Sequence, residues 1–171
     1  ERHVGKNGVN FPILYGRTAY GIQLDFNISK EEAEKWVAGF FALYPRVKEM
    51  IDKCEAYMQK YGYVYTLTKR RRRLDPTLQK SKRQAFNFLI QGLSADMIRM
   101  AINRVRLLGK AHPEWDLRLL MTVHDEAVWE VKEQYVEEAI PLIKYEMENC
   151  MKLKVPLIVD IDSGTKYGEL K

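Results

Sequence analysis

Residues Leu117–Lys132 have the sequence LRLLMTVHDEAVWEVK, in which two apolar runs flank the polar triplet His124-Asp125-Glu126. The runs are rich in residues that favour strands, so the pattern predicts a β-hairpin whose tight turn carries two adjacent carboxylates. Two carboxylates held side by side repel each other, and a hard divalent cation such as Mg²⁺ would neutralise them. The alternative is a solvated acidic turn between two strands, and other segments of the chain must distinguish the two.

Composition indicates the kind of partner and compartment. The 171 residues make one domain or a compact part of a larger one, and the net charge of +5 favours an anionic partner. The cysteines, Cys54 and Cys150, lack metal-ligand spacing and indicate a reducing compartment. No apolar run reaches the length of a membrane span, so we expect a cytoplasmic protein with no membrane partner. Because the chain opens on Glu1, we also expect a piece of a longer polypeptide.

The first fifteen residues place two cations and two aromatic rings at helical spacing. Arg2 and Lys6 are four residues apart, and so are Phe11 and Tyr15. Residues four apart lie on one helix face, so cations beside a flat aromatic surface suit a nucleoside triphosphate. The alternative is an amphipathic helix with a wet basic side and a buried aromatic side.

Periodicity predicts the remaining elements. Helices are expected at residues 27–43, 45–60, 80–108 and 134–151, strands at 63–67 and 156–161, and a break at 16–21. The strand at 63–67 and the basic run that follows it are expected to form a short hairpin, which could follow a phosphate backbone or be an ordinary solvated surface.

The longest predicted helix carries a polar row. Arg83, Asn87 and Gln91 recur every four residues, and such a row drifts by only about 40° over two turns. Long polar side chains in a straight row suit the acceptors of a duplex minor groove, although three ordinary surface residues would give the same spacing. Gly92 lies inside this helix and indicates a close approach by another backbone or by a ligand.

Several segments, in this order, resemble family A DNA polymerases. The hairpin VHDEAVWEV is similar to the palm motif C of that family, and Arg83-x3-Asn87-x3-Gln91-Gly92 to its primer-template helix. The stretch GYVYTLTKRRRRL resembles the family pattern G-x-V-x-T-L-x-G-R-R-R, with Lys69 where glycine is usual. NFPILYG followed by TAYG resembles the second half of motif B, and VPLIVDIDSG the closing strand. The resemblance covers nearly the whole chain.

The resemblance implies a role for each matching residue. Asp125 and Glu126 would be ligands of two Mg²⁺ ions, and His124 would lie near the primer terminus. Phe11 would pack on the sugar and base of the dNTP, and a phenylalanine there implies discrimination against dideoxynucleotides. The triphosphate would be held by Arg2 and Lys6, and Tyr15 would close the nascent pair site. The implied primer-template contacts are Arg83, Asn87, Gln91, Arg70, Arg71 and Arg72.

Two departures from the family pattern matter. One extra residue lies between Lys6 and Phe11, and we expect a bulge or kink within Gly8–Pro12 to absorb it. Motif A, which carries the other metal-binding aspartate of the family, is absent from the chain. Two-metal phosphoryl transfer needs carboxylates on both sides of the metal pair, so we expect a partner segment or chain with motif A.

The expected fold class is α+β, with mostly helical fingers at residues 1–61 and part of an antiparallel palm sheet at residues 62–171. The expected function is part of a template-directed DNA polymerase that adds dNTPs to a primer 3′-OH, in a bacterial or phage-infected cell or another reducing compartment. The alternative function is a non-catalytic nucleic-acid-binding module. A small metal-dependent nuclease is disfavoured because no further carboxylate or histidine cluster completes a site.

Overall fold

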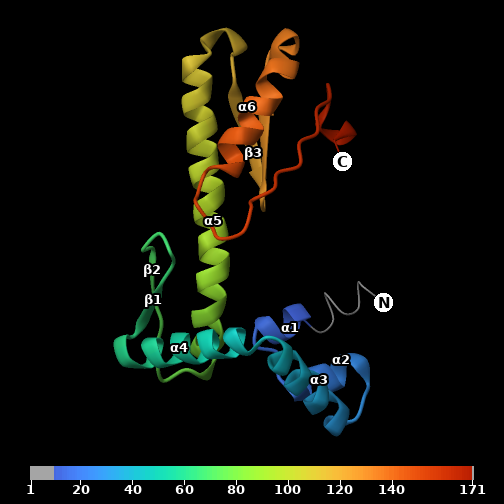
Figure 1. Cartoon of the computed structure of the whole chain (residues 1–171), viewed down its shortest axis with the longest axis vertical. Helices are drawn as coiled ribbons and strands as arrows, with labels where there is room; N and C mark the ends of the chain where they lie inside the picture. The colour runs from blue at the N-terminus through green and yellow to red at the C-terminus, as the bar shows by residue number, and fades with distance from the viewer. Residues whose placement is uncertain (1–9, 171) are drawn as a thin grey trace. The chain divides into compact units, whose positions relative to one another are not determined.

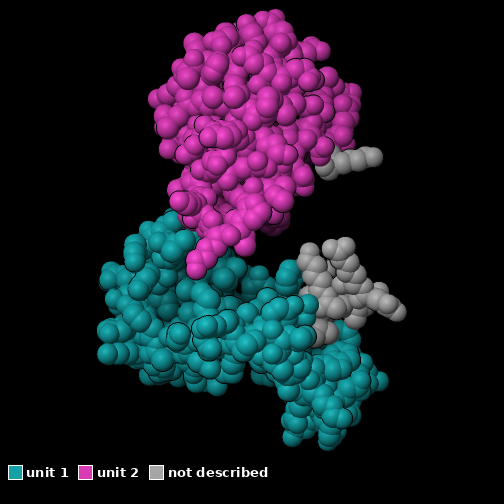
Figure 2. All heavy atoms as spheres, viewed as in Figure 1, with its two compact units in different colours: residues 1–93 teal, residues 94–171 magenta. Residues whose placement is uncertain are grey.

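The computed structural model describes residues 10–170, and the chain divides into two compact units, residues 1–93 and 94–171 (Figure 2). Within residues 10–93, which the structure describes, the first unit has four helices and one hairpin. A second hairpin and the helix α6 belong to the second unit, and the long helix α5 contributes to both (Figure 1). The fold is α+β, as the sequence predicted. The expected boundary between fingers and palm at residue 61 divides the chain by function, whereas the boundary at residue 93 divides it into compact units. The functional boundary stays a prediction.

Capping residues set the ends of the helices in the first unit. Thr18 accepts a hydrogen bond from the Gly21 N–H at 3.3 Å, and Ser29 accepts one from the Glu32 N–H at 3.1 Å, which satisfies donors that the first helical turn leaves unpaired. Pro45 occupies the first turn of the fourth helix, where its missing N–H is tolerated. The four helices are α1 (Phe11–Leu14), α2 (Ala19–Phe26), α3 (Lys30–Leu43) and α4 (Pro45–Tyr61).

The first three helices share a small apolar core. Ile13 of α1 is 2% exposed and packs with Ile22 of α2 and with Ala33 and Phe40 of α3. One side of each short helix therefore faces this core. Because Ile13 points into this core, its neighbours Phe11 and Tyr15 remain partly exposed to solvent.

A hairpin follows α4 in the first unit. Strands β1 (Tyr63–Tyr65) and β2 (Arg71–Arg73) pair antiparallel, with Tyr63 opposite Arg73. Val64 is 2% exposed and packs with Met58 of α4 and with residues at the start of α5 (Gln79–Ala111). The hairpin is thus fixed by a core on one of its faces.

Lys69 occupies the left-handed turn of this hairpin, with φ of +68°. This conformation explains why the family pattern has glycine here, since a Cβ makes it unfavourable by about 1–2 kcal/mol. We expect Lys69→Gly to be more stable than Lys69→Ala by about 1 kcal/mol in urea unfolding. Both substitutions remove the lysine side chain, whose Nζ lies 4.9 Å from the Tyr65 ring centre, so their difference isolates the backbone strain. Equal stabilities would contradict this explanation.

The second unit surrounds one buried tryptophan. Trp115 is fully buried and packs with Val105 of α5 and with Ala139 and Ile143 of α6. The Arg104 Nε atom donates to Glu146 Oε2 at 2.6 Å and ties α5 to α6. The elements after α5 are η2 (Pro113–Trp115), β3 (Arg118–Val123), β4 (Glu126–Glu130), η3 (Glu133–Tyr135), α6 (Val136–Glu148) and η4 (Tyr167–Glu169).

Several sequence predictions were wrong or need new limits. The helix expected from residue 27 begins at Lys30, and the strand expected at 63–67 ends at Tyr65. Residues 156–161 form no strand, because the described residues offer them no strand partner, and the Val159 N–H donates instead to Glu148 Oε1 at 3.0 Å. The predicted break at 16–21 ends at Thr18, since α2 starts at Ala19 and includes Gly21. The last helix spans 136–148 rather than 134–151, with Pro141 inside it. Within the described part of the chain, no helix is long and apolar enough to cross a membrane.

Candidate functional site

The β3–β4 hairpin carries the acidic triplet at its tip. Val123 pairs with Glu126, so only His124 and Asp125 form the turn. His124 has φ of +55°, a left-handed conformation that residues other than glycine rarely adopt. Such local strain is typical of functional sites. The turn predicted from the sequence is therefore present, and Glu126 belongs to the strand beside it rather than to the turn.

Asp125 and Glu126 have the properties of cation ligands. Both side chains are exposed, and neither forms an ion pair with any of the residues the structure describes. Their oxygen atoms are the kind that Mg²⁺ prefers, and Mg²⁺ commonly takes only one or two carboxylates from the protein. Within residues 10–170, no group of three or more histidine, cysteine, aspartate or glutamate side chains lies close enough together to hold a metal. The two carboxylates thus fit part of a magnesium site.

The sheet that carries these carboxylates has an open edge. Among the described residues it contains only β3 and β4, and β3 leaves Leu119, Leu120 and Met121 between 37% and 58% exposed. The register shifts between Leu119 and Met121, which marks a bulge. Two-stranded sheets are marginally stable, and an exposed apolar edge strand is a site for pairing with another strand.

In the first unit, α1 presents the two predicted aromatic residues. Phe11 and Tyr15 are 43% and 42% exposed, and their rings meet edge to face with centroids 6.4 Å apart. They lie beside Ile13, whose burial fixes the helix. The predicted aromatic pair is therefore partly open to solvent. The cations Arg2 and Lys6 lie outside the described residues, and so do Gly8 and Val9, the first two residues of the expected bulge. Asn10, the first described residue, is in a π-helical turn.

Gly16 brings the end of α1 against α5. It has φ of +81°, and a Cβ built on it would lie 2.5 Å from Cγ and 2.7 Å from Cδ of Arg83. Real Cβ atoms do not approach another carbon atom so closely, so any larger residue at position 16 requires the Arg83 side chain to move. Tyr15 and Arg83, which are far apart in the sequence, are thus linked through Gly16. No pattern in the sequence indicates this contact.

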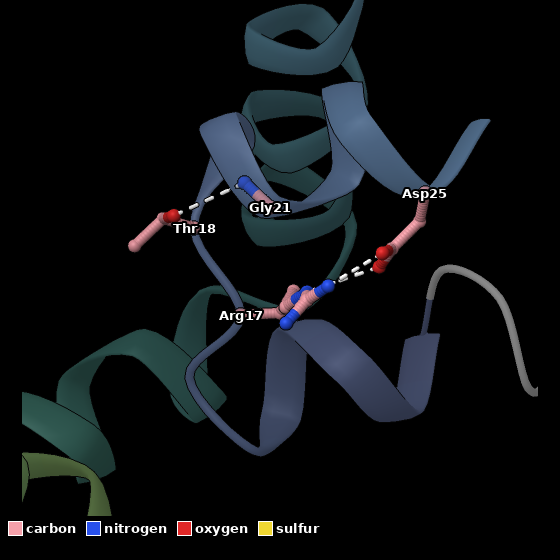
Figure 3. A network of polar contacts seen from close by, with 4 residues as sticks. All are labelled: Arg17, Thr18, Gly21 and Asp25. Atoms are coloured by element: carbon pink, nitrogen blue, oxygen red, sulfur yellow. Dashed lines mark hydrogen bonds and ion pairs between the residues drawn. The ribbon is translucent and has the colours of Figure 1, made fainter. Parts of the chain in front are cut away.

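The corner between α1 and α2 is held by an ion pair that the sequence analysis missed. Arg17 Nε donates to Asp25 Oδ2 at 3.0 Å, and its Nη2 donates to Oδ1 at 2.5 Å (Figure 3). The Arg17 side chain crosses Gly21, where a Cβ would lie 2.6 Å from Nε. This bidentate pair ties Arg17, in the segment between α1 and α2, to Asp25 near the end of α2. Arg17 and Asp25 are eight residues apart, and Arg17 lies outside α2, so helical periodicity does not predict that they pair.

The polar row predicted on α5 lies in the first unit. Arg83 and Gln91 are exposed, whereas Asn87 is partly buried and its Oδ1 atom has no hydrogen-bond partner in the described part of the chain. Gly92 meets the Thr66 side chain, whose Cγ2 would lie 2.7 Å from a Cβ there. A close approach is thus present at Gly92, but a side chain that follows β1 makes it, rather than the backbone or ligand that was predicted.

The basic run is divided between two faces of the β1–β2 hairpin. Arg71 Cζ lies 5.3 Å from the centre of the Tyr63 ring, whereas Arg72 Cζ lies 5.7 Å from that of Phe88 on α5. Strand alternation causes this division, because successive side chains point to opposite faces. Lys82, at the start of α5, forms an ion pair with Glu55 of α4. Arg70, Arg71 and Arg72 therefore do not share one face.

Comparisons with known proteins agree on one family. Residues 1–169 match the model described as DNA polymerase family A. The chain is 36% identical over 170 residues to the thermostable DNA polymerase I of Thermus filiformis, with 95% of this chain and 20% of that protein covered. It is 34% identical over 171 residues to DNA polymerase I of Geobacillus stearothermophilus, with 95% and 19% covered.

A solved structure shares the fold. The POL domain of Pol1 from M. smegmatis, in complex with DNA primer-template and dNTP, aligns with a TM-score of 0.80 and 32% identity, over 86% of this chain and 27% of that one. Among DNA polymerases, this chain therefore belongs to family A. It spans about a fifth of the length of the bacterial DNA polymerase I relatives that it matches.

Proposed function

We propose that this chain supplies the fingers and the C-terminal part of the palm of a template-directed DNA polymerase. Its substrates would be primer-template DNA and dNTPs. In the reaction, the primer 3′-oxygen bonds to the α-phosphorus of a dNTP, and the bond from that phosphorus to the pyrophosphate oxygen breaks. The observation that carries the proposal is the β3–β4 hairpin tip, where Asp125 and Glu126 are exposed and unpaired among the described residues.

Asp125 and Glu126 would hold Mg²⁺ in this proposal, with His124 near the primer terminus. Bound there, Mg²⁺ would offset the negative charge of the triphosphate and favour ionisation of the 3′-OH. A pair of ions needs ligands on both sides, so we assign the opposite carboxylate to a segment outside this chain. The left-handed backbone at His124, a conformation found often at functional sites, would set the direction of the Asp125 side chain.

The first unit would position the substrates. Phe11 would pack on the sugar and base of the incoming nucleotide, Tyr15 would close the nascent pair site, and Arg2 and Lys6 would hold the triphosphate. Arg83, Asn87 and Gln91 would donate to acceptors in the minor groove of the primer-template, where every base pair offers one.

The open edge of β3 would receive the missing segment. Leu119, Leu120 and Met121 expose an apolar strand that pairing with a further strand would cover. A strand added at this edge would end near the hairpin tip, which is where a second aspartate is needed. The same chain of a longer polypeptide or a separate subunit could supply it.

Primer extension tests this division of labour. The chain alone, with Mg²⁺, dNTPs and a primed template, is expected to extend the primer at or near background. Addition of a palm segment that carries the motif A aspartate is expected to restore synthesis, and a segment with alanine in place of that aspartate is the matched control. Robust synthesis by the chain alone would refute the proposal.

Salt dependence provides a test of the DNA contacts. Each phosphate neutralised by a cation contributes about −0.9 to the log-log slope of duplex affinity against salt. Arg72→Gln is therefore expected to make the slope about 0.9 less steep, because Arg72 belongs to the basic run that could follow the phosphate backbone and no carboxylate among the described residues pairs with it. Lys82→Gln is the control, since Lys82 is already paired with Glu55 and its loss is expected to leave the slope unchanged. Anisotropy titrations at several salt concentrations measure both, and equal slopes for parent and Arg72→Gln would contradict the assignment.

A further inference from the structure

Four tyrosines gather where α4 meets β1 in the first unit. Tyr57 and Tyr61 lie one turn apart on α4, and Tyr63 and Tyr65 share the face of β1 opposite the buried Val64. The Tyr57 ring centre is 4.5 Å from that of Tyr61, 5.7 Å from Tyr63 and 5.5 Å from Tyr65. These four side chains, the tyrosine cluster, form one continuous aromatic surface.

The tyrosine cluster is about half open to solvent. Tyr61 is 48% exposed and Tyr65 is 39% exposed. The Tyr57 hydroxyl donates to that of Tyr63 at 3.2 Å, and this hydrogen bond is the main reason that the pKa of Tyr57 is raised to about 12. Tyr57 therefore carries no charge near neutral pH and does not repel a phosphate.

Three cations lie on the faces of these rings. Lys60 Nζ is 5.1 Å from the ring centre of Tyr61, Lys69 Nζ is 4.9 Å from that of Tyr65, and Arg71 Cζ is 5.3 Å from that of Tyr63. No carboxylate in the described part of the chain forms an ion pair with any of the three. The surface thus combines exposed rings with cations that lack an anionic partner there.

We propose that the tyrosine cluster and its three cations form a second nucleic-acid site, which binds single-stranded DNA. Bases would stack on Tyr61 and Tyr65, and Lys60, Lys69 and Arg71 would pair with the phosphates between them. Aromatic rings with interleaved cations bind single strands, whose base faces are open, whereas the bases of a duplex are already stacked. The site is separate from the α5 row assigned to the duplex, and it does not depend on the polymerase chemistry.

Anisotropy with a labelled oligothymidine of about 12 nucleotides tests the stacking, without dNTP or metal. The double variant Tyr61→Leu with Tyr65→Leu is expected to weaken binding by about tenfold or more. Tyr61→Phe with Tyr65→Phe keeps both rings and is expected to bind within about twofold of the parent. Tyr145→Leu, which replaces a 59% exposed tyrosine of α6, is the matched control and is expected to bind normally. Thermal unfolding of each variant checks that the fold is retained.

The charge contribution is tested with the same probe. Each single-strand phosphate contact contributes about −0.7 to the log-log salt slope, so three contacts predict a slope of about −2. The double variant Lys60→Gln with Lys69→Gln removes two of the three contacts, so about a third of the salt slope is expected to remain. The proposal is wrong if the leucine pair binds oligothymidine like the parent, if the phenylalanine pair loses as much as the leucine pair, or if a blunt duplex loses equal affinity. Because this assay involves no synthesis, its failure is distinct from failure of the proposed polymerase function.

Discussion

Asp125→Ala in the assembled polymerase is expected to lower primer extension by several orders of magnitude, because it removes a ligand from a site with few carboxylates. The folded state should hardly change. Asp125 is exposed, forms no ion pair within residues 10–170, and lies in a turn, so its loss should alter the free energy of unfolding by less than about 0.5 kcal/mol. Single-turnover extension and urea unfolding of the same preparation measure the two effects.

Glu130→Ala is the matched control for this prediction. Glu130 is also an exposed carboxylate of the hairpin, but it lies at the far end of β4, opposite Arg118. It should leave extension unchanged, and duplex affinity should stay within about twofold of the parent for both variants. Extension that survives Asp125→Ala would show that the metal role is wrong. If the assembled parent bound duplex DNA but never extended a primer, the non-catalytic binding module would be the better account.

The elements that the sequence predicted well have strong local signals. The helix expected at 80–108 extends over Gln79–Ala111, because a long run of helical periodicity needs little tertiary context. The acidic hairpin was predicted for a similar reason, since two apolar runs flank a short polar turn. The confirmed family follows from several such segments in a fixed order, each of them weak alone.

The elements that were predicted wrongly depend on partners. An apolar run such as residues 156–161 becomes a strand only where another strand accepts its hydrogen bonds, and the described residues provide none. The helix α2 was missed because Gly16 and Gly21 both suggest a break. Only Gly16 has the left-handed conformation that ends a helix, whereas Gly21 is helical and buried beneath Arg17.

The candidate site was predictable as residue types but not as geometry. The sequence identified Arg83 and Tyr15 separately, yet nothing in it indicated that Gly16 joins them. The division of the basic run between two faces required the strand register. Lys69 was partly predictable. The family pattern shows that its position usually holds glycine, and only the structure gives the reason, a φ of +68°.

Gly16→Ala is expected to destabilise the first unit by about 2 kcal/mol, with about 1–2 kcal/mol from the left-handed backbone alone. The remainder comes from the collision of the new Cβ with Cγ and Cδ of Arg83, which must move away. Because Arg83 is the first residue of the α5 row, its displacement should also weaken duplex binding by about tenfold. Urea unfolding and duplex anisotropy measure the two losses.

Two further variants separate strain from collision. Gly39→Ala is the matched control, since Gly39 lies inside α3 with nothing within 4 Å of an added Cβ, and it should stabilise the chain by about 0.5–1 kcal/mol. In an Arg83→Ala background, Gly16→Ala should lose only the backbone part, because the colliding atoms are gone. An unchanged penalty in that background would mean that Arg83 yields freely. Gly16 would then be required for its backbone conformation alone, and the contact between Gly16 and Arg83 would contribute nothing to the free energy of unfolding.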